Sequence, residues 1–177
     1  MNTMINADWM IIIFKAFWCG WGAVGFGILF NVPPRTLFTL YLGGAIGGIL
    51  KFGLIKLTFG VVLASFVGAS VIGILSIPMA HFRHVPPMIF AIPSVIPLIP
   101  GIFAYRTMLG LIKLSGAIGT DYNTIISETV NNGVKTLFII MSLAMGVAIP
   151  MHLMRKESAK NIKLRKKRRQ EDIQINN

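Results

Sequence analysis

Residues 57–80 read LTFGVVLASFVGASVIGILSIPMA, and no Asp, Glu, Lys or Arg interrupts the sequence between Lys56 and Arg83. The hydrocarbon core of a bilayer is about 30 Å thick, so a spanning helix needs roughly 20 apolar residues. This segment is long enough and apolar enough to cross a membrane as one helix. Similar apolar segments lie before and after residues 57–80, and they decide how many further helices are expected to cross the membrane.

The composition of the whole chain agrees with a membrane protein. Charged residues make up 13% of the 177 residues, whereas soluble domains usually carry about 25%. Hydrophobic residues make up 54%, and the mean hydropathy is +0.71. This apolar content excludes disorder for most of the chain, and a single cysteine, Cys19, excludes a disulfide scaffold. We therefore expect an all-α, polytopic integral membrane protein.

Five transmembrane helices are expected, or four as the alternative. Besides residues 57–80, the candidate segments are residues 9–30, 36–57, 87–112 and 133–154. The second of these is apolar only to residue 50, or about 22 Å of helix, and it crosses only if the helix continues to Leu57. In that case Lys51 and Lys56 would lie at the far membrane interface. A re-entrant hairpin is the alternative for this segment, and residues 115–132 are expected to form a polar loop.

Glycines in the second segment favour close helix packing. Gly43 and Gly47, and likewise Gly44 and Gly48, are pairs of small residues four positions apart. Such pairs let helix backbones approach closely in a membrane. In a polytopic protein they more often pack within the chain than at a dimer interface.

The C-terminal residues differ from the rest of the chain. Residues 155–169 contain nine Lys or Arg residues, so the sequence predicts a transmembrane domain at 1–154 and a basic tail at 155–177. Cations beside a span favour the cytoplasmic side, which places the C-terminus in the cytoplasm. The tail suits contact with anionic lipid, and this interpretation is favoured over nucleic-acid binding.

Residues 93–101 carry the most informative motif. Each of Pro93, Pro97 and Pro100 lacks a backbone N–H, at a cost of roughly 3 kcal/mol inside a soluble helix. Regular helix from Pro93 to Gly101 is therefore not expected. The carbonyls of Ile89, Pro93 and Ile96 would lose their usual partners, so protein or water must satisfy them in the membrane. The segment should face the protein interior or a wet cavity.

A second half-helix can begin after Gly101. Its first amides would form a positive pole suited to a carboxylate, and discontinuous helices of this kind build transporter sites. Tyr105 and Arg106 follow one turn later and could also hold a carboxylate. The alternatives are a kinked structural helix and a pair of headgroup anchors at Tyr105 and Arg106.

Other chemistries are not indicated. His81 and His84 lack a third ligand nearby, so a solvated loop is favoured over a metal site. No Ser/His/Asp or Cys/His arrangement stands out, and we expect neither enzymatic activity nor a metal or cofactor. No acidic residue lies inside a predicted span, although intramembrane carboxylates commonly carry protons in transporters. Together with the small number of spans, this suggests half of a transporter that works with a second membrane subunit.

Two motifs resemble the threonine/serine exporter family. They are residues 25–35, GFGILFNVPPR, and residues 95–105, VIPLIPGIFAY. Over residues 10–154 the chain is most similar to the small membrane subunit that in some bacteria works beside a larger partner in succinate export. The resemblance implies an inner-membrane exporter assembled from two half-proteins, and it adds Asn31 to the candidate residues. Arg106 and the basic tail lie outside these motifs.

The expected function is secondary export of a small carboxylate-bearing metabolite, either threonine/serine or a dicarboxylate such as succinate. A non-transporting membrane scaffold or assembly subunit is the alternative. The residues do not select the substrate. The candidate substrate pathway comprises Asn31, Pro93, Pro97, Pro100, Gly101, Tyr105 and Arg106.

Overall fold

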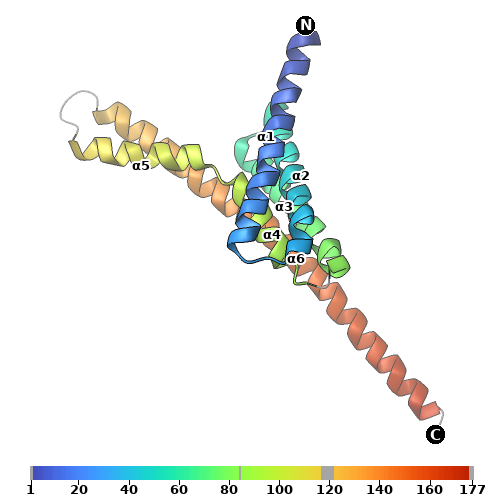
Figure 1. Cartoon of the computed structure of the whole chain (residues 1–177). Helices are drawn as coiled ribbons and strands as arrows, with labels where there is room; N and C mark the ends of the chain where they lie inside the picture. Colours follow the sequence, from blue (N-terminus) through green and yellow to red (C-terminus); the bar gives the residue numbers. More distant parts are fainter. Residues whose placement is uncertain (1, 84, 117–121, 176–177) are drawn as a thin grey trace.

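The computed structural model describes the backbone of residues 2–83, 85–116 and 122–175, and the side chains of those lying within residues 9–153. These ranges are helical and contain no strand (Figure 1). In chain order the elements are α1 (Asn2–Leu29), η1 (Pro34–Thr36), α2 (Leu37–Lys56), α3 (Val61–Arg83), α4 (Met88–Val95), η2 (Ile96–Leu98), α5 (Gly101–Gly116) and α6 (Tyr122–Ile175).

The helices form two packed regions. Helices α1 to α4 pack together with the middle of α6, and we call this region the bundle. The second region, the arm, consists of α5 and the N-terminal part of α6, which lie side by side and project away from α1 and α2 (Figure 1). Beyond the bundle α6 continues as one helix to Ile175.

The number of candidate spans agrees with the prediction. Four helices in the described ranges are long and apolar enough to cross a membrane: Trp9–Leu29, Pro34–Lys56, Val61–Arg83 and Tyr122–Leu153. The pair Met88–Leu98 and Gly101–Gly116 makes a fifth if it counts as one span, with a bend of 56° between its parts. The chain is thus an all-α polytopic membrane protein. Helix α2 is continuous, so the second segment is not a re-entrant hairpin.

Small residues set how closely the helices approach. A Cβ added at Gly44 of α2 would lie 2.7 Å from the Cβ of Ala23 and 2.8 Å from the carbonyl oxygen of Cys19 on α1. At the crossing of α3 and α6, a Cβ on Gly146 would lie 2.8 Å from the carbonyl oxygen of Phe66. The close packing expected of the α2 glycines therefore occurs within the chain, as the small-residue rule for membrane helices predicts.

The predicted loop at residues 115–132 is largely wrong. Helix α5 continues to Gly116 and α6 already begins at Tyr122. The reason is tertiary packing, because Gly110 of α5 fits so tightly against Thr129 of α6 that an added Cβ would lie 2.0 Å from the Thr129 hydroxyl oxygen. Contacts of this kind outweigh the low helix propensity of a polar segment.

The basic tail continues α6 without a break. The backbone passes residues 154 and 155 as regular helix, so no change of secondary structure separates the transmembrane domain from the tail. The side chains of the nine cations lie outside the described residues.

Candidate functional site

The broken helix lies between α4 and α5. Helix α4 passes through Pro93 and ends at Val95, the short helix η2 follows, and Ile99 is extended with φ −61° and ψ 138°. Helix α5 then begins at Gly101. The predicted break and the new half-helix are confirmed, but regular helix persists through Pro93. One proline removes a single hydrogen bond and bends a helix without ending it.

Backbone groups at the break are partly satisfied within the chain. The carbonyl of Ile96, which we expected to be free, accepts a 3.0 Å hydrogen bond from the Ile99 amide. At the start of α5 the Gly101 amide donates to Ile99, while the amides of Phe103 and Ala104 donate to the Pro100 carbonyl at 3.1 and 3.2 Å. The positive pole expected at this half-helix is therefore largely capped by its own chain.

The positive charge at the break comes from another helix. The Lys51 side chain of α2 is buried, with 5% of the residue exposed, and its ammonium donates a hydrogen bond to the carbonyl of Leu98, the last residue of η2. We expected Lys51 at the far membrane interface, and the structure shows in addition that its side chain is buried inside the protein. Lys51 is the one buried charged side chain in the part of the chain whose side chains are described.

Glycines make room for the lysine. Gly68 of α3 faces α2 so closely that an added Cβ would lie 3.1 Å from the Gly47 carbonyl oxygen and 3.6 Å from the Lys51 Cβ. The same Cβ would lie 3.3 Å from the side chain of Leu98. The aliphatic stem of Lys51 therefore packs where α2, α3 and η2 meet. The burial of Lys51 could have been predicted from its position in the sequence. Lys51 follows Gly47 by four residues and Gly48 by three, so it lies on the same face of the helix as these glycines.

Two buried serines lie on α3 and α4, the helices that pack against α2. The Ser94 hydroxyl of α4 donates to the Leu40 carbonyl over 3.4 Å, which is a long hydrogen bond. Ser65 of α3 is fully buried, and its hydroxyl has no hydrogen-bond partner. Ser65 precedes Gly68 by three residues, so both lie on the face of α3 that meets α2. A buried hydroxyl without a partner is rare in proteins and calls for an explanation.

The structure brings together only some of the predicted residues. Pro93 and Pro100 are buried and Pro97 packs against α1, where an added Cβ on Gly22 would lie 3.2 Å from its ring. Gly101 is exposed where α5 begins, and Tyr105, 67% exposed, and Arg106, also exposed, lie on the arm. Asn31 is exposed between α1 and η1, with a positive φ of 55°. Roles for Asn31, Tyr105 and Arg106 in the pathway therefore stay predictions without support from proximity.

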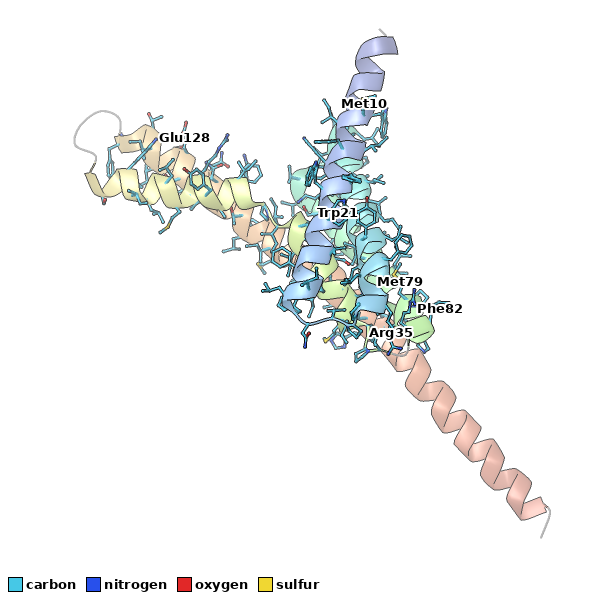
Figure 2. The ribbon with its side chains drawn as sticks, viewed as in Figure 1. Met10, Trp21, Arg35, Met79, Phe82 and Glu128 are labelled. Carbon is cyan, nitrogen blue, oxygen red and sulfur yellow. The ribbon has the colours of Figure 1, made fainter. Side chains whose placement is uncertain are left out.

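A cavity of about 650 Å³ lies on the other side of α4, between α3 and α6. Its walls are mostly apolar, and they include His81 of α3 and His152 of α6. Val95 and Ile96 also line it, so it reaches the last turn before η2. His81, which we expected in a solvated loop, is exposed in the last turn of α3. Figure 2 marks this end of α3 with Met79 and Phe82. His84 lies outside the described residues.

Comparison with known proteins identifies the family. Residues 15–153 match the family model described as threonine/serine exporter, ThrE. A curated uncharacterized protein of Haemophilus influenzae is 27% identical over 154 residues, which cover 82% of this chain and 51% of that protein. The chain thus spans about half the length of this relative. No solved structure matches. Since the family match covers most of the chain, this multi-pass membrane protein belongs to the threonine/serine exporter family.

Proposed function

We propose that this chain is one half of a secondary transporter that exports small carboxylate-bearing metabolites across the bacterial inner membrane. Threonine and serine, or a dicarboxylate such as succinate, are the proposed substrates. The observation that carries the proposal is the break between α4 of the bundle and α5 of the arm, with the buried ammonium of Lys51 bound to its Leu98 carbonyl. Membership of an exporter family supports the direction of transport.

The environment of the break supports a transport site. In a membrane, backbone that is not helical is tolerated only where protein or a polar cavity surrounds it. Leu98 is 1% exposed and Pro100 is buried, so protein covers the residues on both sides of Ile99, whose own side chain is exposed. Discontinuous helices in the middle of a bundle are where many transporters bind substrates and ions.

The arm supports a second subunit. It exposes a large apolar surface, including Ile102, Tyr105, Met108, Leu111 and Ile112 of α5. Arg106 and Glu128 are also exposed on it, and Glu128 lies in its outer part (Figure 2). Lipid tails can cover the apolar residues but cannot satisfy charged ones. We therefore propose that a second membrane half of the same family packs against the arm, as the greater length of the Haemophilus relative allows.

Efflux measurements test this function. Deletion of the chain is expected to trap threonine and serine, or succinate, inside cells that accumulate them, and re-expression should restore efflux only together with the second half. The test quantifies these metabolites in the medium and in the cells over time. Wild-type efflux from the deletion strain would contradict the proposal, as would full transport by the purified chain alone in liposomes. The first outcome would favour the scaffold alternative, and the second would show that the chain transports without a second half.

The orientation follows from the charges. The cationic tail should keep the C-terminus in the cytoplasm, because Lys and Arg beside a span resist translocation. Alkaline phosphatase fused after Asn177 is expected to be inactive, and a fluorescent protein fused there should be bright. A phosphatase fusion after Gly60, between α2 and α3, is the matched control and should be active if the chain crosses five times. Activity at Asn177 would reverse the orientation, and inactivity at both sites would indicate four spans.

A further inference from the structure

We infer that Lys51 is the cation that binds the substrate carboxylate, and that the Leu98 carbonyl holds its ammonium when the site is empty. The inference rests on the proposed function, since it names the residue that recognises the substrate. Neither family motif quoted above includes Lys51, and its position near the end of α2 predicted only an anchor at the interface.

Charge balance is the first argument. The sequence contains no Asp or Glu between Trp9 and Gly116, so α2, α3, α4 and α5 supply no carboxylate to neutralise Lys51. Its partner in the structure is a neutral carbonyl. A carboxylate would add the attraction between opposite charges, which a neutral carbonyl cannot supply, and buried charges in membrane proteins are normally paired. A small anion is the ligand that this ammonium lacks.

The position of the partner is the second argument. In a continuous α-helix the Leu98 carbonyl would accept a hydrogen bond from the amide of Ile102. The break at Ile99 and Pro100 removes that bond and leaves the carbonyl to Lys51. The lysine thus ties α2 to the hinge of the broken helix. A carboxylate that binds the ammonium would break its hydrogen bond to the Leu98 carbonyl, so substrate binding would free the hinge to move.

The unpartnered hydroxyl of Ser65 is the third argument. It is fully buried on the α3 face whose Gly68 packs against the Lys51 stem and the Leu98 side chain. A ligand that reaches the ammonium could accept or donate a hydrogen bond here. The close glycine packing around Lys51 limits its size. The ligand class is therefore a small carboxylate with a second hydrogen-bonding group, which hydroxy amino acids and short dicarboxylates share.

Three substitutions of Lys51 distinguish a role in substrate binding from a purely structural hydrogen bond to the Leu98 carbonyl. Lys51→Gln keeps a donor for the Leu98 carbonyl but has no charge, Lys51→Met keeps the apolar stem alone, and Lys51→Arg keeps the charge. The matched control is Lys15→Gln, which removes an exposed lysine of α1, outside the arm. Each variant is purified with the second half, and the Kd for threonine, serine and succinate is measured by scintillation proximity. Membrane abundance and efflux are measured in parallel.

Lys51→Gln and Lys51→Met are expected to reach normal abundance and to weaken carboxylate binding by about tenfold or more. Lys51→Arg should retain measurable binding, and Lys15→Gln should match the wild type. If Lys51→Gln binds and exports normally while the wild type is active, the lysine is a structural tie and this inference is wrong. If the wild-type complex neither binds nor exports any of the three compounds, the proposed function itself is wrong. Collapse of all three Lys51 variants in abundance would also reject the inference in favour of a folding role.

Discussion

Replacing Pro97 and Pro100 together with alanine is expected to lower export by about tenfold or more, equivalent to at least about 1.4 kcal/mol in the transport barrier, at normal membrane abundance. The two restored amides would let α4 and α5 join into one helix. The Leu98 carbonyl would then accept a hydrogen bond from the chain itself, so Lys51 would lose its partner. Folding should not suffer, because proline disfavours a helix interior by roughly 3 kcal/mol.

The control for this experiment is Pro78→Ala. Pro78 also lies inside a helix, α3, but it is exposed and far along the chain from the break. Efflux and membrane abundance are measured together for both variants, because Pro97 also packs against Gly22 and its loss could reduce the amount of protein. If the double variant exports at the wild-type rate and abundance, the break is only packing, and the substrate site lies elsewhere.

Substituting Gly44 with leucine is expected to remove most of the folded protein from the membrane. The first side-chain atom alone would lie 2.8 Å from the Cys19 carbonyl oxygen and 2.7 Å from the Ala23 Cβ, so α1 and α2 would have to separate. Overpacking a core usually costs about 1 to 3 kcal/mol, occasionally more, and here a backbone atom is among those that must move. Membrane abundance and the melting temperature in detergent measure the effect.

Gly53→Leu is the matched control on the same helix. An added Cβ at Gly53 meets no atom within 4 Å, so this variant should accumulate like the wild type. Equal abundance of the Gly44 and Gly53 variants would mean that the contact between α1 and α2 is looser than the structure shows.

The features that the sequence predicted well depend on local chemistry. Length and hydropathy define the spans, because a helix of about 20 apolar residues crosses the bilayer wherever it packs. The break near Pro100 was also predictable, because proline removes its own hydrogen bond whatever its neighbours are.

The features that were missed depend on contacts between distant segments. Hydropathy counts Lys51 as a charge near the end of a span, and only its position on the glycine face of α2 indicates burial. Tyr105 and Arg106 follow the break closely in sequence, but the 56° bend carries α5 away from the bundle. The cavity with His81 and His152 requires α3 and α6 to be neighbours, and no local pattern encodes that pairing.

Helix α6 has the geometry of a lever. Its 54 residues form one continuous helix, about 80 Å long at 1.5 Å per residue. Gly146, near the midpoint of α6, packs closely against α3. A force that displaces the arm would tilt α6 about its contact with α3 and move the basic C-terminal end in the opposite direction. The segment next to the histidine-lined cavity would tilt with it. Pro150 lies just beyond the contact between Gly146 and α3. Because proline lacks a backbone N–H and so removes one helix hydrogen bond, α6 should bend first at this residue.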